Sequence, residues 1–144
     1  MTSAARTDAT RTDATGSAAK GIALSVVVAT IGAGVLVFLI SLAAQALGAD
    51  PTAVMGLQPM VSLPLTLIGV LAGAIGWNIV RRRATNPARV LSWLVPTVIA
   101  VSLIPDVLVA VPLSPVGGLA LGLMHLAVLA VALPTYRRFL PLPR

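Results

Sequence analysis

The sequence has no cysteine and no glutamate, and it has few aromatic or charged residues. The lack of cysteine excludes disulfides, thiolate metal sites and cysteine nucleophiles. Aromatic residues make up only 3% of the chain, so the stacking platforms that bind single-stranded nucleic acid are missing. Charged residues make up 10%, against about 25% in an ordinary soluble domain. The chain therefore has too few polar side chains to cover the surface of a soluble protein.

Long apolar runs make up most of the 144 residues, and 58% of all residues are hydrophobic. A helix needs about 20 consecutive apolar residues to cross roughly 30 Å of hydrocarbon. Four segments meet this length and predict transmembrane spans at residues of about 22–47, 60–80, 90–111 and 116–135. We predict an all-α integral membrane protein, an antiparallel four-helix bundle over residues 21–136, with a short cytoplasmic tail at 137–144.

The first 20 residues differ in composition from the rest. They contain the pentapeptide Arg-Thr-Asp-Ala-Thr twice in tandem, at residues 6–10 and 11–15. Side chains this small bury too little surface to offset the entropy of ordering, so we predict a disordered cytoplasmic tail over residues 1–20. A cleaved signal peptide is the alternative reading of the first span, with Ala44-Gln45-Ala46 as the cleavage site. Its apolar region would normally be only about 7–15 residues long, which favours an uncleaved span.

The basic residues lie on one side of this predicted topology. All ten lysines and arginines fall in the two tails or between the second and third spans, and the other two loops have none. Cytoplasmic segments carry such an excess, so we predict a multi-pass protein of the cell membrane with both termini in the cytoplasm. This topology also explains the net charge of +6 without nucleic acid as a partner. The bases expected to face lipid head groups are Arg81, Arg82, Arg83, Arg89, Arg137 and Arg138. Trp77, Trp93 and Tyr136 lie near them, where aromatic anchors of the membrane interface are expected.

Small residues at four-residue spacing predict the faces on which the helices pack, because close contact drives helix association in lipid. The candidate positions are Ser25, Ala29 and Ala33 in the first span, Gly69 and Gly73 in the second, and Gly118 and Gly122 in the fourth. They predict packing within one chain, with a homodimer seam as the alternative. Pro64, Pro96 and Pro105 fall inside spans and predict kinks.

Two ionisable residues lie within the predicted spans, Asp106 in the third and His125 in the fourth. Their depths below the outer ends of the helices differ by about 6 Å, at about 1.5 Å of rise per residue. Such residues are costly in a membrane and indicate function, so we hypothesise a proton-responsive polar pair. The structural alternative is that Asp106 caps or breaks the third span, while His125 bonds a backbone carbonyl or a serine such as Ser102.

The stretches Ile104-Pro105-Asp106-Val107-Leu108 and Leu119-Ala120-Leu121-Gly122-Leu123-Met124-His125-Leu126 resemble an actinobacterial family of small four-span integral membrane proteins of unknown function. The similarity covers the span count, the loop lengths and a Met-His pair late in the chain. It implies the architecture, and Asp106 with His125 as characteristic positions. It implies no activity.

The sequence has no cluster of metal ligands, no phosphate-binding loop and no nucleophile elbow, so we expect no metal, no cofactor and no enzyme activity. We predict an accessory or structural membrane component, whose partners are the lipid bilayer and either a membrane protein or a second copy of the chain. The alternative is a small proton-linked transporter or channel that uses Asp106 and His125. Small drug transporters use a membrane glutamate near the start of the chain, which is absent here.

Overall fold

The computed structural model describes residues 3–110 and 112–143, with side-chain surroundings for residues 19–108 and 112–143. The elements are α1 (Ser3–Ala46), a 3-10 turn η1 (Met55–Leu57), α2 (Pro59–Arg83), α3 (Pro87–Ser102), α4 (Ile104–Ala110) and α5 (Pro115–Phe139). Four segments are long and apolar enough to cross a membrane, at Ala19–Ala46, Pro59–Arg83, Pro87–Leu108 and Pro115–Phe139. The predicted all-α fold with four spans is confirmed.

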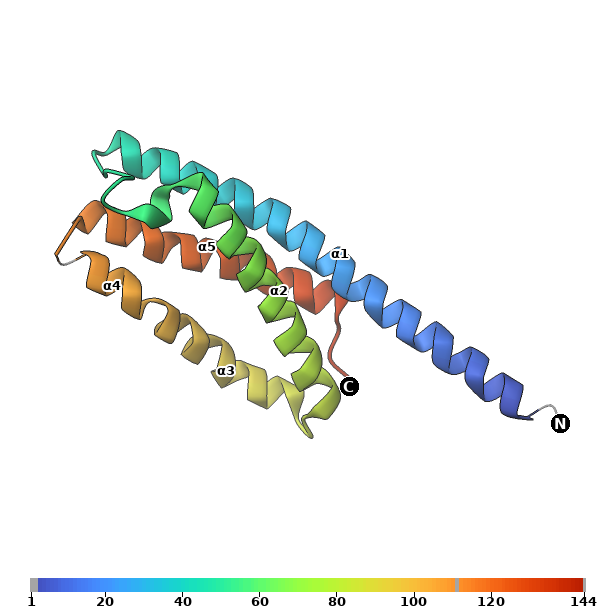
Figure 1. Cartoon of the computed structure of the whole chain (residues 1–144). Coiled ribbons are helices and arrows are strands. Elements are labelled where there is room, and N and C mark those ends of the chain that lie inside the picture. Colours follow the sequence, from blue (N-terminus) through green and yellow to red (C-terminus); the bar gives the residue numbers. More distant parts are fainter. Residues whose placement is uncertain (1–2, 111, 144) are drawn as a thin grey trace.

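The helices run antiparallel in chain order (Figure 1). α1 lies along α5, α2 crosses the bundle obliquely, and α3 with α4 forms the side away from α1. This order brings Lys20, residues 81–89 and residues 137–138 to one end of the bundle, which we call the basic end. Residues 47–58 and 112–114 form the opposite end, which we call the loop end.

α1 continues beyond the bundle at its N-terminal side (Figure 1). It is helical from Ser3, whereas the sequence predicted a disordered tail over residues 1–20, of which residues 1–2 lie outside the described residues. The physical reason is the cost of starting a helix. Once the span has formed the helix, each further turn adds hydrogen bonds without a new nucleation step.

A ridge of buried residues at every fourth position of α1 forms the centre of the bundle. The ridge consists of Ser25, Ala29, Ala33, Val37 and Ser41, each at most 1% exposed. Its first three members are the small residues that the sequence predicted to pack. At the loop end, the Ser41 hydroxyl donates a hydrogen bond to the carbonyl of Leu57, which fastens η1 to α1.

α1 ends in a Schellman motif around Gly48, which has a φ of +90°. The N–H of Ala49 donates to the carbonyl of Ala44 at 2.9 Å, and the N–H of Gly48 donates to that of Gln45 at 3.0 Å. Ala49 and Ala44 are both buried, which supplies the apolar contact that accompanies this motif. The chain turns here toward η1 because glycine adopts a positive φ without a steric penalty.

Replacing Gly48 by alanine is expected to lower the free energy of unfolding by about 1–2 kcal/mol, because a Cβ is disfavoured at this backbone conformation. The matched control is Gly76→Ala, since a Cβ at Gly76 in α2 would meet no atom within 4 Å. Unfolding of both variants in mixed micelles with increasing SDS measures the difference. Equal stability of the two variants would show that the positive φ does not matter.

The third span is interrupted between α3 and α4. Leu103 separates the two helices, and Pro105 follows in the first turn of α4. Proline has no N–H, so the carbonyl of Val101 loses its helical donor there. The predicted helix over residues 90–111 is therefore two helices joined at Leu103.

The sequence predicts Trp77 and Tyr136 as anchors at the membrane interface. In the structure both lie in the core at the basic end. Their exposed fractions are 4% and 6%, and their ring centroids are 6.0 Å apart. The indole N–H of Trp77 donates to the carbonyl of Leu140 at 2.9 Å, and the hydroxyl of Tyr136 donates to that of Val70. Trp93 is 60% exposed, which is the position expected of an interfacial anchor.

Candidate functional site

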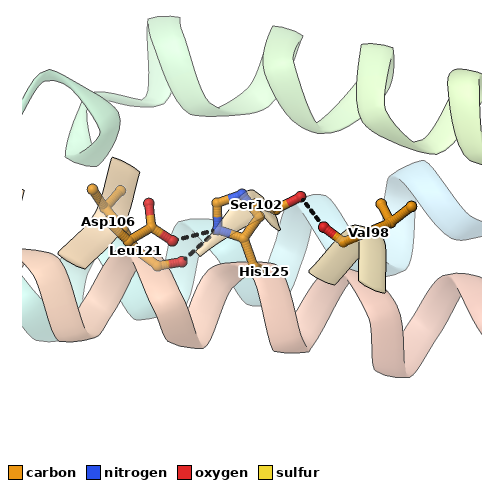
Figure 2. A network of polar contacts seen from close by, with 5 residues as sticks. All are labelled: Val98, Ser102, Asp106, Leu121 and His125. Carbon is orange, nitrogen blue, oxygen red and sulfur yellow. Dashed lines mark hydrogen bonds and ion pairs between the residues drawn. The ribbon is translucent and has the colours of Figure 1, made fainter. Parts of the chain in front are cut away.

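Asp106 and His125 face each other between α4 and α5 (Figure 2). Asp106 lies in the first turn of α4, and His125 lies near the middle of α5. Oδ2 of Asp106 is 2.8 Å from Nδ1 of His125. The carboxylate is buried, while the side chain of His125 is 39% exposed. The two residues that the sequence singled out are therefore in direct contact.

Nδ1 of His125 lies between two oxygen atoms. It is 3.0 Å from the carbonyl oxygen of Leu121, and this contact has the geometry of a hydrogen bond (Figure 2). Oδ2 of Asp106 is close enough for an ion pair but has no well-aligned hydrogen bond. A bare Nδ1 lone pair would repel both oxygens, so the bond to the Leu121 carbonyl requires a proton on Nδ1. The arrangement can hold a proton between a carboxylate and an imidazole.

Ser102 does not bond to His125. Its hydroxyl donates to the carbonyl of Val98 in its own helix, at 2.8 Å (Figure 2). Of the two partners expected for His125, a serine or a backbone carbonyl, the structure has the carbonyl, that of Leu121. Asp106 does not extend to the membrane interface as a cap of the third span, because its carboxylate is directed at α5.

A cavity of about 350 Å³ lies beside the pair, between α4 and α5, and we call it the α4–α5 groove. Its lining consists of Leu103, Asp106, Val107, Gly118, Leu119, Gly122, Leu123 and Leu126. Among the described residues that line it, Asp106 alone has a polar side chain. Leu119 and Leu123 are each more than half exposed on the outer surface of the bundle. The groove therefore opens sideways, toward the surface that lipid would cover.

The four glycines predicted to pack have different surroundings. Gly118 and Gly122 line the α4–α5 groove. A Cβ at Gly73 would lie 2.9 Å from the hydroxyl of Tyr136, whereas one at Gly69 would meet no atom within 4 Å. Gly69 thus contacts no other described helix of this chain. The buried face of α2 instead consists of Ser62, Thr66, Val70, Ala74 and Trp77.

The six arginines predicted to face lipid head groups all lie at the basic end. Arg81 donates to the carbonyl of Pro141 at 3.3 Å and to Oδ1 of Asn78 at 3.2 Å, so it also holds the C-terminal residues in place. Arg137 lines a second cavity between α3 and α5, which the sequence gave no means to detect. The remaining four, Arg82, Arg83, Arg89 and Arg138, are exposed.

Comparison with known proteins gives a family but no relative of known function. Residues 17–141 match the model of a family of unknown function, DUF6069. No curated protein and no solved structure matches the chain. Among the described residues, no three histidine, cysteine, aspartate or glutamate side chains come together as a metal site. The match covers all four spans together with Asp106 and His125, and the chain therefore belongs to this family of unknown function, DUF6069.

Proposed function

We propose that this protein is an accessory component of the cell membrane that binds a transmembrane helix of a partner protein in the α4–α5 groove. The observation that carries the proposal is the position of this groove. It lies next to the contact between the buried Asp106 and the partly exposed His125, yet its lining is otherwise apolar and it opens to the lipid-facing surface. An actinobacterial source stays a prediction from the sequence.

The shape and chemistry of the groove suit a helix better than a solute. Gly118 and Gly122 line it at four-residue spacing, which allows a second helix backbone to approach closely. Leu119 and Leu123 stand beside them and would pack against the partner. A path for ions or polar solutes needs polar groups along its walls. The hydroxyl side chains of α3 on the basic side of the pair, Ser92, Thr97 and Ser102, each donate to a carbonyl of their own helix.

The proposed orientation places the basic end in the cytoplasm, with both termini inside. The described bases gather at one end of the bundle (Figure 1), and cytoplasmic segments carry such an excess of lysine and arginine. The groove then lies in the outer half of the membrane. The expectation of no enzyme activity stays a prediction from the sequence, which has no nucleophile elbow and no cluster of metal ligands.

Photo-crosslinking tests the proposed docking site, and the lack of cysteine makes single-cysteine labelling specific. A thiol-linked photo-crosslinker on Leu123→Cys is expected to give a discrete protein adduct in native membranes. Leu39→Cys is the matched control, because Leu39 is a leucine of similar exposure on α1 (54% against 56%). Gly122→Leu, which fills the groove, is expected to remove the adduct. Identical adducts from both cysteine positions would contradict a site in the groove.

A small proton-linked transporter or channel is the second candidate, favoured by the 2.8 Å contact between Asp106 and His125. Proton uptake by reconstituted liposomes after an acid pulse separates the two candidates. The accessory role predicts that the protein and its Asp106→Asn variant show the same background uptake. Uptake that disappears in Asp106→Asn would instead support proton transport.

A further inference from the structure

The second cavity lies at the basic end, between α3, α5 and the C-terminal residues. Its volume is about 270 Å³, and its apolar walls include Leu91, Val95, Leu133 and Leu142. Ser92 and Arg137 supply polar groups to the lining. The cavity exists because α3 is anchored mainly near its start, where Pro87 and Leu91 are buried, while the rest of α3 packs loosely.

The C-terminal residues form one wall of this cavity and are held firmly. Leu140 is 1% exposed, and its carbonyl accepts the indole N–H of Trp77. Arg81 donates to the next carbonyl, that of Pro141. These bonds set the position of Leu142 against the cavity. Hydrogen bonds from α2 to the C-terminal residues therefore fix this wall of the cavity.

The electrostatic surroundings of the cavity are positive. Within residues 19–143, the basic side chains are Lys20, Arg81, Arg82, Arg83, Arg89, Arg137 and Arg138, and all lie at this end. The acidic side chains of the same residues, Asp50 and Asp106, lie toward the loop end. Arg137 makes no side-chain hydrogen bond or ion pair within the described part of the chain. Its guanidinium is free to bind a phosphate, for which its geometry is well suited.

We propose that this cavity binds an anionic phospholipid of the leaflet that surrounds the basic end. The phosphate contacts Arg137, and part of one acyl chain lies between Leu91, Val95 and Leu133. The hydroxyl of Ser92 donates to the carbonyl of Arg89 at 2.8 Å, so its oxygen can still accept a bond from the head group. This lipid site is independent of the partner helix proposed for the α4–α5 groove, which lies toward the other end of the bundle.

Native mass spectrometry of the full chain, titrated with phosphatidylglycerol and with phosphatidylcholine, tests the site. Phosphatidylglycerol is expected to bind more tightly, and Arg137→Gln is expected to weaken it about fivefold, as one arginine near a membrane surface does. Arg138→Gln removes the same charge from the neighbouring position, outside the cavity lining, and is expected to change the affinity less than Arg137→Gln. Equal losses in the two variants would overturn the proposal in favour of a diffuse charge effect.

A second variant tests the acyl-chain part and leaves every arginine in place. Val95→Phe fills the cavity and is expected to weaken phosphatidylglycerol binding while circular dichroism shows an unchanged helix content. Glycerol 3-phosphate carries the head-group charge without the chains and is expected not to compete. Unchanged binding by Val95→Phe, or competition by glycerol 3-phosphate at the lipid's own concentration, would overturn the proposal.

Discussion

Replacing His125 by leucine is expected to lower the free energy of unfolding by about 3–5 kcal/mol, because it leaves the carboxylate of Asp106 buried without its partner. The carboxylate is 8% exposed, and the imidazole of His125 faces it at 2.8 Å. The oxygen at this contact has no hydrogen-bond partner among the described residues. Unfolding in mixed micelles with increasing SDS, at neutral pH, measures the loss.

The double variant Asp106→Leu with His125→Leu is the test of coupling. It removes both members of the pair together and leaves no buried carboxylate without a partner, so its stability is expected to return to within about 1–2 kcal/mol of the unaltered protein. Asp106→Leu alone is expected to cost less than His125→Leu, since His125 keeps its bond to Leu121 and is partly exposed. Losses that simply add in the double variant would show that the two residues do not act as a pair.

The effect of His125→Leu is also expected to depend on pH in a defined direction. Lowering the pH protonates the unpartnered carboxylate and removes the buried charge, so the variant regains stability as the pH falls. The double variant has neither group and is expected to show no such recovery. A loss that is constant from pH 8 to pH 5 would indicate a packing defect in place of an unpaired charge.

The second large effect is expected for Trp77→Ala, at about 3–5 kcal/mol, the usual cost of removing a buried aromatic ring. Trp77 fills the core at the basic end, contacts Tyr136 and donates its N–H to Leu140. Trp93→Ala makes the same change at a site that is 60% exposed, and it is expected to cost under about 1 kcal/mol. Trp77→Phe keeps an aromatic ring but removes the hydrogen bond together with part of the ring, and it is expected to cost less than Trp77→Ala, at about 1–3 kcal/mol. Similar losses for Trp77→Ala and Trp93→Ala would contradict the core position of Trp77.

The spans and the candidate pair could be predicted because both depend on properties of consecutive residues, namely hydropathy and the helical rise per residue. Hydropathy over about 20 residues identifies a span without knowledge of its neighbours. The helical rise per residue gives the depths of Asp106 and His125 below the ends of their helices. Because a short loop joins these antiparallel helices, residues of similar depth lie side by side. The direct contact at 2.8 Å is consistent with that arithmetic.

Other features depend on the angular position of a residue around its helix, which spacing alone does not give. A Gly-x-x-x-Gly pattern marks two positions on the same face, but Gly69 shows that the face need not meet a neighbour in the chain. Trp77 and Tyr136 lie one turn or less from arginines, as interfacial anchors do, yet their rings turn inward. Pro105 lies just after the break at Leu103, whereas Pro64 and Pro96 lie inside continuous helices, so the position of a proline alone does not identify the break.

The buried ridge of α1 has a consequence for how the other helices cross it. A helix turns about 100° per residue, so each four-residue step advances the ridge by about 40° around the axis. From Ser25 to Ser41 the ridge therefore rotates by about 160°, nearly to the opposite side of the helix.

α1 consequently changes partners along its length. A side chain at Gly21 or Gly32 would meet α5 or the residues that follow it, one at Gly34 would meet Leu63 of α2, and Ser41 bonds η1. One inserted residue in α1 would turn every later position of this spiral by about 100° away from its partner. An insertion in the second half of α3 would displace no buried residue of that half, but it would turn Asp106 of α4 away from His125. We therefore expect length changes within the family to be excluded both from the ridge of α1 and from the part of the third span that precedes Asp106.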